Sequence, residues 1–478
     1  MDTVKRMELL AKPDVNAAVD RLRDVLRRSL PAGSFAEREE ALLAIGEEAS
    51  RRVLVAELQA ISDGFGPRVL IDGKEYKRHE SGAETYWSLS GGLRIERSTY
   101  RPVGVHNGAT VVPLELEAGL VEGATPAMAY NVANGYALHD MRTHGELLTA
   151  AHRLPPPRAT LERAAKRIAA SVTAAIPRIE PLVRQLEQLP EGAHGVVMGL
   201  DRGATPMAEE RPADAPAKPE RKRRKPRVRR APAPVDVNYR MAYAGTVSVV
   251  DSNGEALLTR HYATVANDDP AELVKRMAAD VRTALRRNPN LMVGLMQDGA
   301  PEMWNLTREG LAALQRDGAL DHWVEGIDRY HLLERLAHAL EITEPDVGVR
   351  KQRLDAWNAE LDSQDSAIDS IDRYFLDRYR ELPTDRQEKL WEHLVFLSNN
   401  KDRLRYVTLA VAGLPCGSGV TESGVKTVIG QRAKNSGQRW SVPGLRGVLM
   451  LRAIHHSERL PQFWKYYSRR YTATVEAA

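Results

Sequence analysis

The stretch HGVVMGLD, at residues 194–201, decides the fold class of this chain. It is a short apolar run that ends abruptly in an acid, which is typical of a strand buried on both faces of a sheet. LMVGLMQD at 291–298 repeats the pattern, and HWVEGID at 322–328 gives it a third time. Helical patterns alternate with these runs, so the sequence predicts an α/β domain with a central sheet.

The segments between these strands complete the predicted domain. NYRMAYAGTVSVVD and EALLTRHYATV lie on either side of Ser252-Asn253-Gly254, and Asn-Gly between two such runs indicates a hairpin. Helices are predicted over 271–287, 330–340, 345–410 and 418–435. A long helical insertion therefore precedes the last helix of the domain.

The N-terminal part has a different pattern. Residues 1–62 have helical spacing, and 67–114 is divided into short β-rich runs, which predicts a meander of strands. Residues 125–175 are helical again. In the helix predicted at 158–170, four basic residues lie off the apolar stripe: Arg158, Arg163, Lys166 and Arg167. A short helix followed by one with a basic face is typical of a helix-turn-helix that reads DNA, and a solvated helix pair explains the pattern equally well.

Composition limits the class of protein. The chain has 478 residues, which suggests three domains of about 150 residues each. No run approaches the roughly 20 apolar residues of a membrane span, and the first ten residues lack a signal-peptide core. We therefore expect a cytoplasmic protein without a membrane partner. The single cysteine, Cys416, excludes a disulfide framework and a cysteine-rich zinc site.

Charge is concentrated in one segment. The run KPERKRRKPRVRR at 218–230 holds nine Lys or Arg and one Glu, a net +8. Removing that +8 from the chain's total of +4 leaves −4 for the rest. A local basic block favours polyanion binding, with a solvated linker as the alternative. We expect a disordered basic loop over 203–235, and its candidate DNA contacts are Arg221, Lys222, Arg223, Arg224 and Lys225.

Three acids form a candidate site. Asp201 and Asp298 end apolar strands, where active sites of open α/β sheets lie, although a turn-forming Asp explains each one singly. Glu422 falls in the first turn of the helix predicted at 418–435, where Ser418 and Thr421 are candidate caps. Three carboxylates suit Mg²⁺, and two such ions can support an in-line phosphoryl displacement. We expect two Mg²⁺ ions, for which Mn²⁺ can substitute.

Four segments carry a family resemblance. They are LDRGATPM (200–207), QDGAPEMW (297–304), DRYH (328–331) and the block from CGSGVTES to GQRAKNSGQRW (416–440). With them the chain resembles bacterial insertion-sequence transposases of the DDE class, in the Kra-type group related to Mutator-like transposases. The resemblance covers 194–465 well and 1–190 loosely. It implies an RNase H-like core that cleaves DNA at the element ends and transfers the 3′-OH ends into target DNA.

The resemblance also implies roles for particular residues. Asp201, Asp298 and Glu422 match the catalytic triad and its metal ligands. Asp328 and His331 match an auxiliary element that acts without binding metal, although an Asp N-cap with a packed His explains the same pair. Four residues that follow Glu422 are candidate DNA contacts, with a solvated helix end as the alternative: Arg432, Lys434, Arg439 and Trp440.

The predicted partners and organisation follow from the same resemblance. The partners are double-stranded DNA, as terminal inverted repeats and as target, and further copies of the chain in a dimer or larger assembly on the bacterial nucleoid. The predicted parts, in chain order, are a helical and β-meander region (1–120), a helix-turn-helix-like unit (121–190), the first part of the core (191–341), a helical insertion (342–415), and the last core helix with the tail (416–478).

Other functions are weighed against this one. A nuclease on the same fold would cut without joining, and a transposase-derived DNA-binding regulator would not cut at all. A dinucleotide-binding enzyme is disfavoured because Glu422 occupies the last glycine position of the G-x-G-x-x-G pattern that begins at Gly417. A carboxylate there would repel a pyrophosphate.

Overall fold

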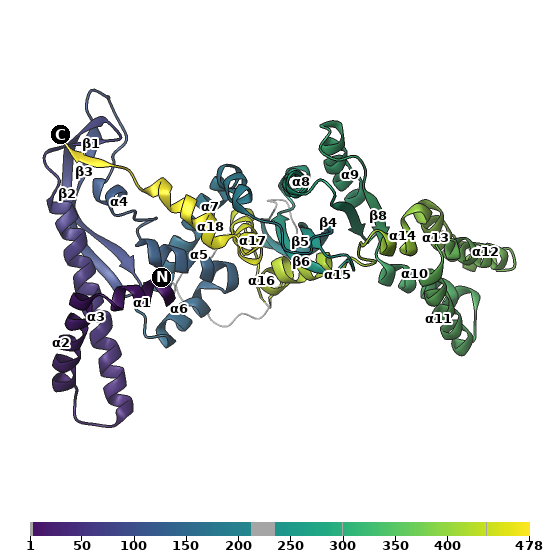
Figure 1. Cartoon of the computed structure of the whole chain (residues 1–478), viewed down its shortest axis with the longest axis horizontal. Helices are drawn as coiled ribbons and strands as arrows, with labels where there is room; N and C mark the ends of the chain where they lie inside the picture. The colour runs from purple at the N-terminus through teal and green to yellow at the C-terminus, as the bar shows by residue number, and fades with distance from the viewer. Residues whose placement is uncertain (1–2, 212–234, 299, 436) are drawn as a thin grey trace. The chain divides into compact units, whose positions relative to one another are not determined.

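The structure is a computed structural model that describes residues 3–211, 235–298, 300–435 and 437–478 of a mixed α/β chain (Figure 1). The chain divides into two compact units, one formed by 1–168 with 468–478 and the other by 169–467. Helix α7 (Arg158–Leu186) contributes residues to both. Among the described residues, none of the helices has the length and apolar character needed to cross a bilayer.

The first unit combines helices with a four-stranded antiparallel sheet of order β3-β2-β1-β9. Its elements are α1 (Thr3–Leu10), α2 (Pro13–Ser29), α3 (Phe35–Asp63), β1 (Arg68–Ile71), β2 (Lys74–Ser88), β3 (Gly91–Pro102), α4 (Pro113–Glu117), α5 (Pro126–Leu138), α6 (Met141–Ala150) and β9 (Val475–Ala477). The predicted meander is confirmed up to Pro102. The end of the meander predicted over 67–114 is wrong, because Pro113 opens a short helix there, and Val111 forms an isolated bridge to Tyr100.

The second unit contains a five-stranded sheet of order β6-β5-β4-β7-β8. Its strands are β4 (Gly195–Glu210), β5 (Val235–Val250), β6 (Ala256–Thr264), β7 (Met292–Gln297) and β8 (Val324–Ile327). The first three form an antiparallel meander, whereas β7 is parallel to β4 and β8 is parallel to β7. The hairpin predicted at Asn253-Gly254 is confirmed, with Gly254 at a φ of 78°.

Helices cover both faces of this sheet. On one face lie α8 (Pro270–Arg287) and α9 (Pro301–Arg316), and on the other lie α15 (Gly419–Val425) and α17 (Val442–His456). After β8 comes α10 (Arg329–Thr343), the helix predicted at 330–340 in the first part of the core. The segment predicted as a helical insertion at 342–415 contains α11 (Val347–Ser363), α12 (Ala367–Tyr379), α13 (Thr384–Asn400) and α14 (Tyr406–Val411). The unit also contains a π-helical turn (Lys426–Gly430), α16 (Gln431–Ala433) and α18 (Leu460–Ser468).

Strand β4 differs from its prediction. It does not end at Asp201 but continues to Glu210, and β5 begins at Val235, so the expectation of a disordered loop over all of 203–235 is wrong at both ends. The two strands pair without interruption from Gly195↔Val250 to Glu210↔Val235. β4 and β5 continue to pair with each other beyond the residues that pair with β7 and β6. The Glu209–Arg240 ion pair, at 2.7 Å, lies in this extension. We call residues 202–210 and 235–243 the arm.

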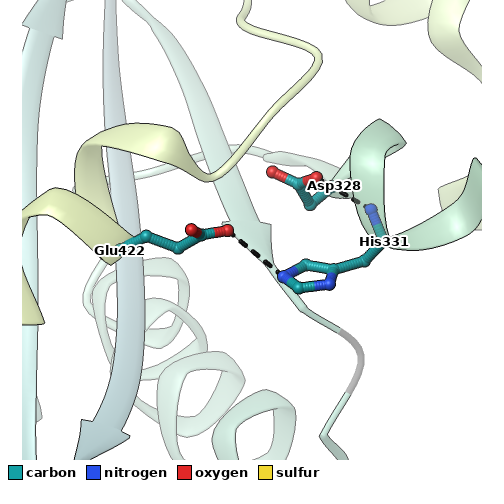
Figure 2. A group of neighbouring side chains, drawn as sticks. All are labelled: Asp328, His331 and Glu422. Atoms are coloured by element: carbon teal, nitrogen blue, oxygen red, sulfur yellow. Dashed lines mark hydrogen bonds and ion pairs between the residues drawn. The ribbon is translucent and has the colours of Figure 1, made fainter. Parts of the chain in front are cut away.

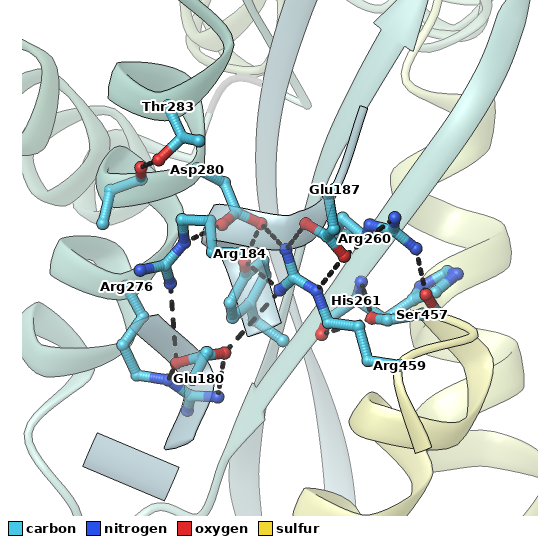
Figure 3. Close-up of polar contacts among 12 residues, drawn as sticks. Glu180, Arg184, Glu187, Arg260, His261, Arg276, Asp280, Thr283, Ser457 and Arg459 are labelled. Carbon is cyan, nitrogen blue, oxygen red and sulfur yellow. Dashed lines mark hydrogen bonds and ion pairs between the residues drawn. The ribbon is translucent and has the colours of Figure 1, made fainter. Parts of the chain in front are cut away.

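Two buried clusters stabilise the second unit. In the insertion Trp357 is buried against Phe375, whereas Trp391 is 52% exposed beside Tyr379. A buried ionic network joins α7, α8, β6 and the start of α18 (Figure 3). At its centre Asp280 accepts hydrogen bonds from Arg184, Arg459 and Tyr262.

Candidate catalytic site

The three predicted acids meet in one small pocket. Asp201 lies on β4 one position after the buried Leu200, Asp298 follows β7 directly, and Glu422 lies in the first turn of α15. All three line a cavity of about 20 Å³, together with Leu200, Gln297, His331, Ser418 and Thr421. That volume holds about one water molecule or ion. The parallel pairing of β4 with β7 ends at Met198, so the strands separate where the acids gather.

A missing side chain allows α15 to approach the sheet. A Cβ on Gly199 would lie 2.1 Å from Thr421 Oγ1, and one on Gly424 would lie 2.9 Å from Thr246 Cγ2. Thr421 therefore rests directly on β4 and shares a 2.8 Å hydrogen bond with Thr246 on β5. The prediction that Thr421 caps its helix is wrong, since its hydroxyl faces the sheet. Glu422, the next residue, is thereby positioned at the strand edge.

The surroundings of Asp201 affect its ionisation. Burial raises the pKa of Asp201, and the negative charges of Asp298 and Glu422 raise it further, while the Arg202 N–H and His331 oppose the change. A cation bound beside Asp201 would offset the repulsion among the three carboxylates and favour the ionised form of Asp201. The donor set of hard oxygens fits Mg²⁺, which the resemblance implies.

His331 connects α10 to the acid cluster. It lies in the first turn of α10, and its Nε2 is 3.2 Å from Glu422 Oε1, as Figure 2 shows. Lys426 lies one turn beyond Glu422, with its Nζ 3.7 Å from Oε2. Glu422 is therefore flanked by two nitrogen groups, and His331 has a direct contact with a predicted catalytic acid.

Asp328 has a different position from His331. It is the N-cap of α10, where Oδ1 accepts the His331 N–H at 3.1 Å. Its Oδ2 accepts a hydrogen bond from the Ser418 N–H and another from the Ser418 Oγ at 2.9 Å. Ser418 is thus no side-chain cap of α15, contrary to prediction, because its hydroxyl is committed to Asp328. Asp328 is 3% exposed and fastens the start of α10 to the segment that carries Glu422.

A second possible metal arrangement involves these auxiliary residues. One ligand atom from each of Asp328, His331 and Glu422 lies within 4.8 Å of the others. Oδ2 of Asp328 accepts two hydrogen bonds and Oδ1 accepts one, which leaves a lone pair on Oδ1 for an ion. The set Asp201, Asp298 and Glu422 does not involve Asp328.

The sequence did not indicate the neighbours of this pocket. Arg202 donates to Glu302 at 2.6 Å, and the Tyr243 hydroxyl donates to the same carboxylate at 2.5 Å. These residues lie on the α9 side of the sheet. The Glu302 position in QDGAPEMW, four residues after Asp298, was the available signal.

The predicted DNA contacts after Glu422 divide into two groups. Lys434 and Arg439 are exposed, whereas Arg432 is 4% exposed and its guanidinium carbon lies 4.9 Å from the centre of the Trp440 ring. Trp440 exchanges main-chain hydrogen bonds with Pro206 and Ala208 of the arm, and its Nε1 donates to the Ala433 carbonyl. The burial of Arg432 contradicts its predicted contact with phosphate, and Trp440 has a packing role.

The remaining predicted contacts belong elsewhere in the chain. Arg158, Arg163, Lys166 and Arg167 are all exposed on α7. Arg158 pairs with Glu162 at 2.8 Å, and Arg167 pairs with Glu122 at 3.0 Å. The basic residues Arg221, Lys222, Arg223, Arg224 and Lys225 lie outside the described residues.

Comparisons with known proteins give a structural likeness and no sequence match. No family model matches the chain, and neither does any curated protein. Among solved structures the chain is similar to the Drosophila P element transposase strand transfer complex, with 12% identity and a TM-score of 0.24. That match covers 72% of this chain and 83% of the other.

Proposed function

We propose that the chain is a DNA transposase whose Asp201, Asp298 and Glu422 hold Mg²⁺ for cleavage at element ends and for transfer of the 3′-OH ends into target DNA. The observation that carries the proposal is the single pocket. Asp201, Asp298 and Glu422 are separated by 97 and 124 positions in the sequence, yet all three line it. Burial, followed by the charges of the other two acids, raises the pKa of Asp201.

The sheet supports an RNase H-like assignment for the core. Numbered along the second unit, its strands have the order 3-2-1-4-5, with an antiparallel meander followed by two parallel strands. In this arrangement the first strand, β4, lies at the centre beside the fourth, β7. Asp201 on β4 and Asp298 after β7 are adjacent for that reason, and α15 contributes Glu422.

Each residue of the pocket then has a defined task. The three carboxylates would ligate the metal, which activates the attacking oxygen and stabilises the leaving oxygen when bound. His331 orients Glu422 through the 3.2 Å contact, and in its charged form it can face a phosphate. Asp328 is a positioning residue, because it fixes Ser418 and α10 and touches neither metal nor DNA in this scheme.

DNA is the proposed partner, and affinity would come from groups outside the pocket. The exposed basic residues of α7 in the helix-turn-helix-like unit, the exposed Lys434 and Arg439, and the 218–230 run are candidates. Phosphate contacts of this kind dominate binding to DNA and make it dependent on salt. We also propose assembly of two or more copies on DNA.

The test is a cleavage and joining reaction with DNA that carries the element's own terminal repeats, Mg²⁺ and a supercoiled target. The proposal expects 3′-OH ends at the repeat boundary and their covalent joining to the target. Asp201→Ala, Asp298→Ala and Glu422→Ala should each abolish both steps while end binding persists. Cutting without joining would indicate a nuclease, and binding without cutting would indicate a regulator.

A further inference from the structure

The arm has one covered side and one open side. The side with Thr205, Met207 and Ala242 packs in part against a core cluster that includes Ile429 and Leu449. The opposite side presents Val237, Tyr239 and Met241, which are 45%, 72% and 44% exposed. Alternate residues of a strand point to the same side, so these three form one row.

The row continues to the neighbourhood of the acids. Tyr243 is the next member, and its cross-strand partner is Arg202, whose side chain is 39% exposed. Across the ribbon from the larger residues lie small ones: Ala204 opposite Met241, Pro206 opposite Tyr239, and Ala208 opposite Val237. The Tyr239 ring, opposite Pro206, therefore has no long cross-strand neighbour on β4.

We infer that this open side of the arm binds unpaired DNA by stacking bases on Tyr239 beside Met241, with Arg202 near the backbone. The inference rests on the proposed function, since it names the form of DNA that the same site would handle. Proteins bind single strands through aromatic rings combined with positive charge. Here the sequence that joins the two strands of the arm contains the nine Lys or Arg of 218–230.

A single strand fits this side better than a duplex does. In a duplex the base faces are stacked on one another, so an exposed ring and a thioether have only edges and phosphates to meet. A second copy of the chain is also less suited, because the neighbouring +8 segment would repel its own equivalent.

Asp201 and the open side of the arm lie on opposite faces of β4. Asp201 lies on the α15 side of β4 with Gly199, whereas Arg202 points to the α9 side with Glu302. A strand held at Asp201 and its unpaired complement can therefore leave on opposite sides of β4. Tyr239 faces Pro206, five residues beyond Asp201, which corresponds to roughly 17 Å along the strand.

The experiment measures binding of fluorescein-labelled oligothymidine and of a blunt duplex to the full chain by anisotropy, in EDTA and over a range of salt. Tyr239→Ala should weaken oligothymidine binding by roughly fivefold to a hundredfold, the effect of losing one stacked base. Its salt slope should be unchanged, because no phosphate contact is lost. Tyr239→Phe should bind like the wild type. Phe35→Ala is the matched control, since Phe35 is 74% exposed in the other unit, and it should have no effect.

Four results would overturn the inference. Three concern affinity: Tyr239→Ala binds oligothymidine as tightly as the wild type, Tyr239→Ala loses equal affinity for duplex and single strand, or Phe35→Ala loses as much affinity as Tyr239→Ala. The fourth is a change in oligomeric state with Tyr239→Ala, which would show that a second copy covers the arm. Because binding is measured without metal, the outcome is independent of cleavage. Tyr239-dependent binding by a chain that never cleaves would sink the proposed function alone, and cleavage with Tyr239-independent binding would sink only this inference.

Discussion

Replacing Asp328 by Asn should loosen the support of Glu422 by a measurable amount. The carboxylate accepts three hydrogen bonds, one from His331 and two from Ser418, and it is buried. An amide can keep its oxygen toward only one side and turns an N–H₂ donor toward the other. If the oxygen stays with His331, the new donor faces the Ser418 N–H, which is also a donor.

The size of the effect follows from those bonds. A hydrogen bond to a charged group contributes about 1.5–3 kcal/mol, and a buried donor left unpaired costs about 1–3 kcal/mol. Since the Ser418 hydroxyl can turn to accept from the amide, part of the loss is recovered. We expect Asp328→Asn to lower the free energy of unfolding by about 2–4 kcal/mol. Ser418→Ala, which removes only the hydroxyl and its bond to the carboxylate, should cost about 1.5–3 kcal/mol.

Urea unfolding followed by tryptophan fluorescence measures this change in the right unit, because six of the seven tryptophans lie within 169–467. Asp346→Asn is the matched control. Asp346 is an exposed N-cap of α11 that accepts the Val349 N–H at 2.9 Å, and Asn caps a helix as well as Asp does. If Asp328→Asn is no more destabilising than Asp346→Asn, Asp328 is an ordinary cap and the account of Ser418 fails.

Four further results are expected. Because the pKa of Asp201 is raised on folding, the folded protein is most stable when this carboxyl is protonated, below pH ~4, and it loses stability as pH rises through the folded pKa. Asp201→Asn should therefore raise the melting temperature near neutral pH in EDTA and have no effect below pH ~4. Mg²⁺ at about a hundred times its Kd should stabilise the wild type by about 2.7 kcal/mol, and its removal by EDTA should reverse this, with Asp201→Asn showing neither change. His331→Ala should slow cleavage by about a hundredfold with an unchanged melting temperature; early melting with normal cleavage would mark His331 as structural. Burial alone would raise the pKa of Asp280, but Arg459 and Arg184 hold it below its usual range. Asp280→Asn should therefore lower the free energy of unfolding by about 3–5 kcal/mol at neutral pH, and this difference from the wild type should shrink as pH falls below ~4. A difference in stability that does not depend on pH would contradict the ion pairing.

Much of the second unit could be predicted from the sequence. Apolar runs such as 291–298 and the Asn253-Gly254 turn have a local pattern that predicts their structure. These patterns identified the strands and helices, and they showed that Asp201 and Asp298 each follow an apolar run. The end of β4 could not be predicted in this way. Pro206 and the charged residues after it have low strand propensity, and pairing with β5 and with Trp440 overrides it.

Side-chain partners that are distant in sequence were also beyond prediction. Ser418 and Thr421 have the residue types of helix caps, yet their hydroxyls bond to Asp328 and Thr246, 90 and 175 residues away. The same limit applies to Arg432, which looked like a surface cation and is buried over Trp440. Only the three-dimensional fold determines which of two satisfactory partners a polar group takes.

The most direct test of the account is where metal binds. Mn²⁺ binding to the full chain can be followed by electron paramagnetic resonance for the wild type, Asp201→Asn and His331→Ala. The account predicts that Asp201→Asn loses bound Mn²⁺ and that His331→Ala retains it. Loss with His331→Ala and retention with Asp201→Asn would place the ion among Asp328, His331 and Glu422, and would contradict the three-carboxylate site.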